Sequence, residues 1–116
     1  MKTSPSYEQV NARILKFRDD RDWKQFHTIQ SLITSLAIEA GELLELTQWK
    51  DTDACQKLAD SEDLRDECAD VLLYLMELAD CAGFDLLQAA NDKLDKCDVK
   101  YPVDKARGTS KKYNQL

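Results

Sequence analysis

The segment 63–82 constrains the fold of this chain more than any other part of the sequence. On a helical wheel its apolar side chains cover well over half of the circumference; they are Leu64, Val71, Leu72, Leu73, Leu75, Met76, Leu78 and Ala79. A helix that is apolar on so many sides must be covered by several neighbours, in a bundle core or at a subunit interface. Gly83, a residue typical of helix C-termini, marks its end. The sequence therefore predicts a helical protein organised around this segment.

Three further segments have the periodicity of amphipathic helices. The first covers residues 7–21, the second follows Thr28 and continues to about residue 49, and the third follows Asp85 and continues to about residue 100. Thr and Asp are both typical N-cap residues. Strand-like alternation is absent, and three Gly and two Pro favour long helices with short turns. We predict an all-α fold, a bundle of four to five helices completed by oligomerisation.

The remaining segments are less regular. Residues 22–27 are expected to form an irregular joint, and the polar segment 51–62 is compatible with either a short helix or a loop. A proline disfavours helix at the residue before it, so Pro102 should end the last long helix and leave 103–116 as an irregular basic tail. In this helix Leu86, Leu87, Ala90, Leu94 and Cys97 are expected to face inward. A length of 116 residues predicts a single domain, 1–116, whose small core would gain from burial against a second copy.

Charge and cysteine content exclude several classes of function. The net charge of −6 argues against a nucleic-acid polymer as partner, although residues 93–116 carry seven Lys or Arg and three Asp, a net +4. The four cysteines form no C-x-x-C motif and the chain has one histidine, which disfavours a structural zinc site. No apolar run is long enough to span a bilayer or to act as a signal peptide. We therefore expect reduced thiols, no membrane partner and a cytoplasmic location.

Two pairs of carboxylates, each spaced three residues apart, lie in two of the predicted helices. The pairs are Glu39 with Glu42 and Glu67 with Asp70. Residues three apart are neighbours on one helix face, so two such helices side by side would bring four oxygen ligands together. A hard cation such as Mg²⁺, or alternatively Mn²⁺, requires ligands of this kind. Glu39 also falls within an apolar stripe, where a carboxylate is costly unless it is paired or binds a metal. The stripe comprises Leu32, Leu36, Leu43 and Leu46.

The carboxylate pairs alone are also compatible with a solvated surface or with a different class of protein. In a chain that is 33% charged, most E-x-x-E spacings belong to solvated helix faces. A non-catalytic helical oligomeric interaction module would explain the amphipathic helices but not the position of Glu39. A di-iron carboxylate protein would need Glu-x-x-His pairs, which the single histidine does not supply.

Several stretches of the sequence together resemble the signature of one family. They are R-D-W-K-Q-F-H from residue 21, L-A-I-E-A-G-E-L-L-E-L from residue 36, Q-W-K from residue 48, D-E-C-A-D-V-L-L-Y-L from residue 66 and K-Y-P-V-D-K-A-R-G from residue 100. They resemble the MazG-like nucleotide pyrophosphohydrolases, whose signature is E-x-x-E followed by E-x-x-D, here separated by 24 residues. The tryptophan-containing stretches are closest to the dCTP pyrophosphatase branch. The resemblance extends from about residue 17 to residue 113.

The resemblance implies an all-α enzyme that hydrolyses a nucleoside triphosphate to the monophosphate and pyrophosphate with Mg²⁺, as a house-cleaning activity. It also implies a homo-oligomer, a tetramer built from two dimers, with sites between subunits. The implied metal ligands are Glu39, Glu42, Glu67 and Asp70; the implied base and sugar pocket comprises Trp23, His27, Trp49 and Tyr74; and the implied phosphate contacts are Lys93 and Lys100. One departure concerns Cys97, where the family usually has an Asn that contacts the nucleotide. Selectivity among bases is therefore expected to be relaxed here.

Overall fold

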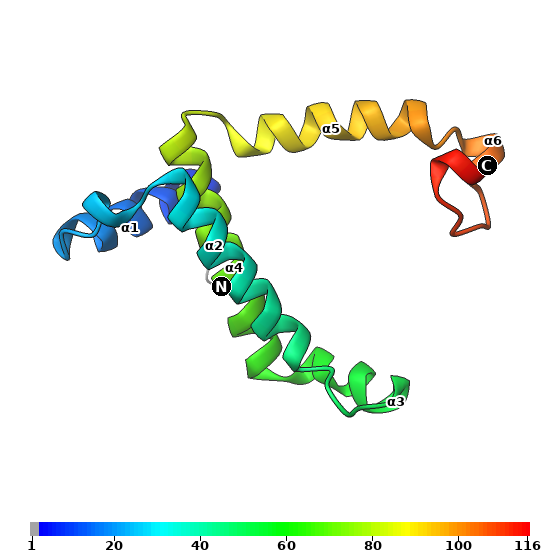
Figure 1. Cartoon of the computed structure of the whole chain (residues 1–116), viewed down its shortest axis with the longest axis horizontal. Coiled ribbons are helices and arrows are strands. Elements are labelled where there is room, and N and C mark those ends of the chain that lie inside the picture. The colour runs from blue at the N-terminus through cyan, green and yellow to red at the C-terminus, as the bar shows by residue number, and fades with distance from the viewer. Residues whose placement is uncertain (1–2) are drawn as a thin grey trace. The chain divides into compact units, whose positions relative to one another are not determined.

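The computed structural model describes residues 3–116, and every regular element among them is helical. The long helices are α1 (Tyr7–Asp20), α2 (Ile29–Glu45), α4 (Glu62–Ala82) and α5 (Leu86–Lys100), and the short ones are α3 (Thr52–Gln56) and α6 (Val103–Ala106) (Figure 1). Single 3₁₀ turns lie at Lys24–Phe26, Lys57–Asp60 and Tyr113–Gln115. The predicted all-α fold is confirmed. Within the described residues, no helix is long and apolar enough to cross a membrane.

The helix ends follow the capping residues of the sequence. Thr28 accepts a hydrogen bond from the backbone N–H of Ser31, and Asp85 accepts one from the backbone N–H of Gln88, so both predicted N-caps are confirmed. Gly83 ends α4 with a φ of 78°, in the left-handed region that glycine adopts without steric cost. Of the two alternatives for the segment 51–62, the short helix is the one that forms.

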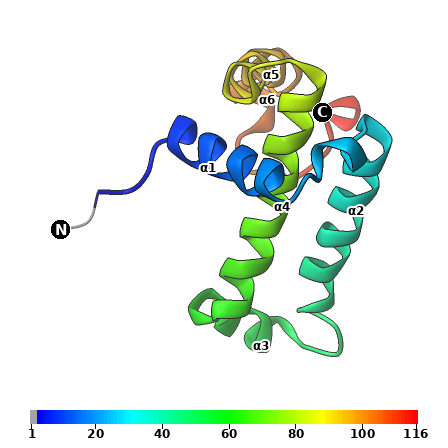
Figure 2. The same ribbon diagram turned by 90° about the vertical axis from the view of Figure 1, so that its left-hand side faces the viewer.

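The contacts within the chain divide it into two units, with the boundary between Gly83 and Phe84. In the first unit α2 and α4 lie side by side, and α1 packs against α4 (Figure 2). The core of this unit is small, and its fully buried side chains are Leu32 of α2 and Met76 of α4. Apolar side chains also lie on its surface, among them Ile33, Leu44 and Leu72, each about half exposed or more. The pair α2–α4 therefore carries more apolar surface than this unit covers.

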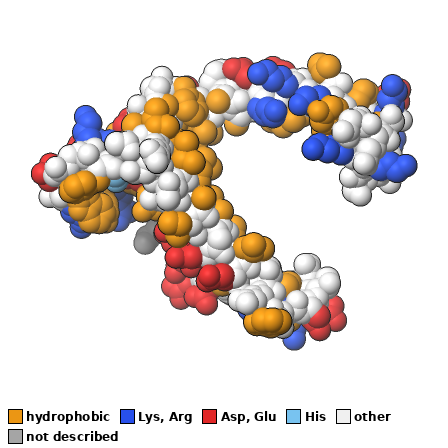
Figure 3. Space-filling model, in the orientation of Figure 1, with side chains coloured by type: hydrophobic (Ala, Val, Ile, Leu, Met, Phe, Trp, Pro, Cys, Tyr) orange, Lys and Arg blue, Asp and Glu red, His pale blue; other side chains and the backbone are white. Residues whose placement is uncertain are grey.

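The second unit consists of α5, α6 and the C-terminal segment, and it differs from the prediction in two ways. Leu87 and Leu94 are 56% and 63% exposed, because a single long helix with a short tail has too few neighbours to cover an apolar face. The tail is not irregular, since it contains α6 and ends in a 3₁₀ turn where Tyr113 packs edge-to-face against Tyr101. Lys and Arg side chains are concentrated along this unit (Figure 3).

The second helix ends earlier than predicted, at Glu45 and not near residue 49. The Thr47 hydroxyl donates to the carbonyl of Leu44, and the Lys50 ammonium donates to the carbonyl of Leu46. These bonds satisfy the last carbonyls of the helix, which is one way in which a helix terminates. Trp49 then adopts a φ of 62°, which is rare for a bulky side chain.

Candidate active site

The four predicted metal ligands meet where α2 packs against α4. One carboxylate oxygen from each of Glu39, Glu42, Glu67 and Asp70 lies within 4.8 Å of the others. The three-residue spacing places each pair on one face of its helix, and the side-by-side packing of the two helices turns those faces toward each other. Glu39 is half-buried among the apolar residues of α2, as its position in the stripe predicts. The geometry can therefore supply four oxygen ligands to one cation.

The electrostatics of this carboxylate cluster are unfavourable without a cation. Burial raises the pKa of Glu39 above its ordinary value, and the neighbouring charges of Glu42, Asp70 and Glu67 raise it further. Burial likewise raises the pKa of Glu67, again with contributions from Glu42 and Asp70. One oxygen of Glu39 and one of Glu67 are buried without a hydrogen-bond partner among the described residues. Unpaired buried oxygens surrounded by like charges fit a divalent cation, whose preferred ligands are carboxylate oxygens.

A pocket of about 830 Å³ adjoins the carboxylate cluster and shares Asp70 with it. Aromatic side chains line it: Trp23, His27 and Tyr74, all predicted as nucleotide contacts, together with Phe17, whose ring meets Trp23 edge-to-face at 5.8 Å. The remaining lining residues are Thr3, Pro5, Gln9, Val10, Arg13, Ile14, Leu73 and Glu77. A pocket of this size, apolar with a few convergent polar groups, is typical of a small-molecule site.

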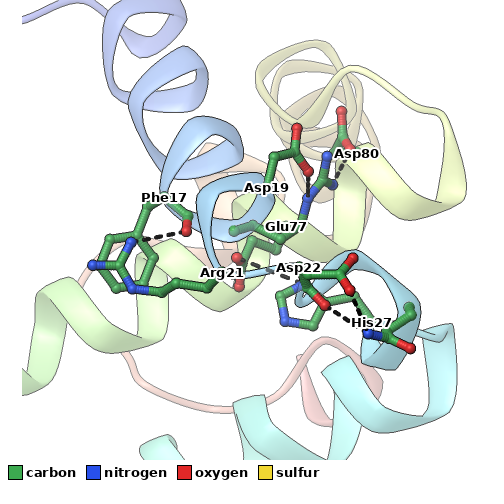
Figure 4. Close-up of polar contacts among 9 residues, drawn as sticks. Phe17, Asp19, Arg21, Asp22, His27, Glu77 and Asp80 are labelled. Carbon is green, nitrogen blue, oxygen red and sulfur yellow. Dashed lines mark hydrogen bonds and ion pairs between the residues drawn. The ribbon is translucent and has the colours of Figure 1, made fainter.

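Near the C-terminal end of α4, beyond the carboxylate cluster, the pocket contains one more carboxylate, which is buried. Glu77 lies on the same face of α4 as Asp70, and its Oε1 is 3.7 Å from Nδ1 of His27 (Figure 4). Burial raises the pKa of Glu77, while the charges of His27 and Arg18 counteract that rise and Asp80 adds to it. Unlike the carboxylates of the cluster, this carboxylate has an imidazole and a guanidinium near it within the chain.

Arg18 fixes α1 against this end of α4. Its side chain is 8% exposed, and its guanidinium donates to Asp19 at 2.9 Å and to Asp80 at 3.2 Å (Figure 4). Asp80 is 62 residues away in sequence, so this contact holds one wall of the pocket against the other. Two carboxylate partners compensate the charge of the buried guanidinium, which makes its burial tolerable.

Three predicted substrate contacts lie elsewhere. Trp49 is 94% exposed in the turn after α2 and does not line the pocket. Lys93 and Lys100 belong to α5 in the second unit, where the Lys100 ammonium lies 4.8 Å from the centre of the Tyr113 ring. Cys97, also on α5, is a half-buried free thiol.

The sequence analysis identified neither Arg18 nor Glu77 as part of the site. Arg18 follows Ile14 by four residues and so lies within the apolar stripe of the first helix. A charge inside an apolar stripe is the same signal that singled out Glu39, and it would have identified Arg18 as well. Glu77 lies seven residues after Asp70 and three after Tyr74, a spacing that keeps all three on one helix face.

The fold and this site together define an all-α protein that gathers four carboxylates on a helix pair beside an aromatic pocket. The model of the MazG-like family matches residues 34–116. The chain is 39% identical to dCTP pyrophosphatase 1 of Mus musculus and to that of Homo sapiens, over 97% of this chain and 68% of each relative. A crystal structure of a pyrophosphatase from Archaeoglobus fulgidus superimposes with a TM-score of 0.78 at 34% identity, covering 88% of this chain and 98% of that one. The chain belongs to the MazG-like family.

Proposed function

We propose that this protein is a Mg²⁺-dependent nucleoside triphosphate pyrophosphohydrolase that converts a deoxynucleoside triphosphate to the monophosphate and pyrophosphate, with dCTP among its substrates. The observation that carries the proposal is the convergence of four carboxylate oxygens within 4.8 Å beside an aromatic pocket. The similarity to proteins named dCTP pyrophosphatase supports the choice of substrate.

Glu39, Glu42, Glu67 and Asp70 would hold the metal. A bound divalent cation supplies charge neutralisation of the triphosphate and a coordinated water of lowered pKa that can attack the α-phosphorus. Either Glu39 or Glu42 would orient that water. Mn²⁺ can replace Mg²⁺ in such an oxygen-ligand site.

The pocket would hold the base and sugar. Trp23 and Tyr74 present aromatic rings on which a base can stack, and His27 supplies the pocket with ring nitrogens that can form hydrogen bonds. Asp70 belongs to both the pocket and the carboxylate cluster, so a nucleotide whose base enters the pocket would have its phosphates near the metal ligands. Lys93 and Lys100 would contact the phosphates in the assembled enzyme.

We further propose that residues 1–116 act as one catalytic domain in a homo-oligomer, a tetramer built from two dimers. The exposed apolar residues of α2, α4 and α5 need a covering surface, and large exposed apolar patches usually mark interfaces. Trp49 is almost fully exposed in a strained turn, which suits a residue that enters the site of a neighbouring copy. A monomeric mass by light scattering at micromolar concentration would contradict this assembly.

A non-catalytic interaction module accounts for the site less well. It would leave two buried carboxylate oxygens without partners and four like charges together at a cost, with no function to explain them.

The direct test is product analysis after incubation of the protein with dCTP and Mg²⁺. We expect dCMP and pyrophosphate. Formation of dCDP and orthophosphate would contradict attack at the α-phosphorus, and an absence of turnover with every deoxynucleoside triphosphate would contradict the proposed activity.

Selectivity gives a second test through Cys97. A thiol is a weak hydrogen-bond partner, and loss of one hydrogen bond corresponds to about 0.5–1.5 kcal/mol, which is a few-fold to about tenfold in discrimination. We expect at least one other deoxynucleoside triphosphate to be hydrolysed at a rate comparable to dCTP. Cys97→Asn should then change selectivity more than metal dependence, whereas absolute specificity of the unaltered enzyme for dCTP would contradict this role of Cys97.

A further inference from the structure

His27 is the only histidine of the chain, and the residue is held at two points by α4. Its Nδ1 faces Oε1 of Glu77 at 3.7 Å, and its backbone carbonyl accepts a hydrogen bond from the Cys81 thiol at 3.3 Å. Glu77 and Cys81 are four residues apart and therefore lie on one face of the helix. The joint that carries His27 is thus anchored to a rigid element through both its side chain and its backbone.

The contact between His27 and Glu77 is buried, and it involves a single carboxylate. The side chains of His27 and Glu77 are 15% and 8% exposed, and Nδ1 is buried without a hydrogen-bond partner among the described residues, 3.7 Å from Oε1 of Glu77. Besides His27, the charged groups that act on Glu77 are Arg18 from α1 and Asp80 from α4. Arg18 is itself hydrogen-bonded to two aspartates. The phenol of Tyr74 faces the same pocket and is affected by the charge of Glu77. Among the described residues, Glu77 is the one carboxylate within ion-pair distance of the imidazole. A lone pair on Nδ1 would be repelled by that carboxylate, whereas an N–H would be attracted to it.

We propose that Glu77 is a positioning residue for nucleotide recognition: it fixes the His27 proton on Nδ1, so that the neutral ring offers Nε2 to the pocket as a hydrogen-bond acceptor. An ionised carboxylate only accepts hydrogen bonds, and the hydrogen bond of one imidazole nitrogen determines the state of the other. The inference rests on the proposed function in one respect, namely that the base of a nucleotide occupies this pocket.

The chemical consequence is a preference among bases. An acceptor nitrogen can bind the exocyclic amino group of cytosine or adenine, whereas the carbonyl oxygen at the equivalent position of thymine or uracil offers only another acceptor. Stacking on the aromatic side chains tolerates any base. The pair of Glu77 and His27 is therefore a means by which the pocket favours an amino-bearing base, and it is separate from the carboxylate cluster that would bind the metal.

Because the chain has a single histidine, its tautomer can be measured without ambiguity by ¹⁵N NMR of the imidazole at pH 8, in the absence of nucleotide and metal. We expect the proton on Nδ1 in the unaltered protein. In Glu77→Leu, which removes the acceptor, the proton should move to Nε2, and Glu77→Gln, which keeps an amide oxygen, should lie between the two. Glu62→Gln is the matched control, since it removes an exposed carboxylate in the first turn of the same helix, and it should leave the tautomer unchanged. A proton on Nε2 in the unaltered protein, or no difference between it and Glu77→Leu, would overturn the proposal.

Kinetics with dCTP and dTTP test the consequence for recognition. In Glu77→Leu the ratio of kcat/KM for dCTP to that for dTTP should fall by about two- to tenfold, through KM for dCTP and with little change in kcat. Glu77→Gln should keep part of the ratio, and Glu62→Gln should leave it unchanged. If the unaltered protein hydrolyses dCTP and the ratio does not change in Glu77→Leu, the recognition role fails while the proposed function stands. If the unaltered protein releases no pyrophosphate, the proposed function fails and the NMR comparison alone decides the positioning role.

Discussion

Carboxylates lie toward both ends of one face of α4, and the groups that surround them differ between the two ends. At Glu67 and Asp70 the carboxylates face two more carboxylates from α2. None of these four carboxylates is in the ion pairs found among the described residues. At Glu77 the carboxylate faces His27, with Arg18 close enough to lower its pKa. Burial raises the pKa of Glu67 and of Glu77 alike, and the two ends differ in the partners of these carboxylates.

The comparison separates a cluster that would gain from a cation from a carboxylate whose partners lie within the chain. Four carboxylates within 4.8 Å repel one another when ionised, and a bound cation would remove that repulsion. The other end gains stability and orientation from its own residues. The following predictions test whether the two ends behave so differently.

The largest effect should follow from a change in the carboxylate cluster. Glu39→Gln or Asp70→Asn should lower kcat by more than about a hundredfold, because changing even a residue that only hydrogen-bonds to a metal ligand costs roughly 10- to 100-fold. Circular dichroism should show an unchanged helical content. Glu45→Gln, which alters an exposed carboxylate on the same helix, is the matched control and should remain active. Full activity of both site variants would remove the cluster from the mechanism.

Mg²⁺ should raise the melting temperature of the metal-free protein by binding to the carboxylate cluster, with no contribution from Glu77. A ligand at about 100 times its Kd stabilises the folded state by roughly 2.7 kcal/mol. Differential scanning calorimetry with and without Mg²⁺ measures this. Glu77→Leu should respond to Mg²⁺ as the unaltered protein does, whereas Asp70→Asn should respond weakly. Equal stabilisation of Asp70→Asn and the unaltered protein would mean that Mg²⁺ binds elsewhere.

At the other end of α4, Arg18→Gln should destabilise the protein without affecting Mg²⁺ binding. The guanidinium is 8% exposed and hydrogen-bonds two aspartates, and hydrogen bonds to charged groups contribute about 1.5–3 kcal/mol. Urea denaturation measures the loss. Lys16→Gln, on an exposed face of the same helix, should change stability little. An Arg18→Gln variant as stable as the unaltered protein would show that α1 is held by its apolar contacts alone.

The carboxylate cluster could be predicted from the sequence, whereas the pairing of Glu77 with His27 could not. Glu39 was recognisable because it interrupts an apolar stripe on its own helix, and the three-residue spacings located its partners. The pairing of Glu77 with His27 joins residues 50 positions apart across a joint without regular periodicity, and no local pattern records such a contact. The end of α2 was missed for a similar reason, since the bonds from Thr47 and Lys50 that terminate it depend on the fold of the turn.

The smallest effect should be the pH dependence of stability of the metal-free protein. A raised pKa in the folded state, as for Glu39 and Glu67, means that the folded protein binds the proton more tightly than the unfolded chain does. The stability that these groups contribute is therefore fully present below their unfolded pKa and is lost as the pH rises through the folded pKa. Carboxylates with a lowered pKa, such as Asp19, act in the opposite direction, so the difference between two variants is the informative quantity.

Thermal melting of metal-free protein between pH 5 and pH 7.5 measures this difference. Glu39→Gln should gain stability relative to the unaltered protein as the pH rises, because it lacks a carboxylate that must ionise among like charges. Glu77→Gln should gain less, since His27 and Arg18 stabilise the ionised form of the carboxylate that it removes. Saturating Mg²⁺ should reverse the trend for the unaltered protein, because cation binding requires ionised ligands. Equal pH-dependent gains in the two variants would show that the two ends of α4 are electrostatically alike, and the distinction between a recruited cation and internal partners would not hold.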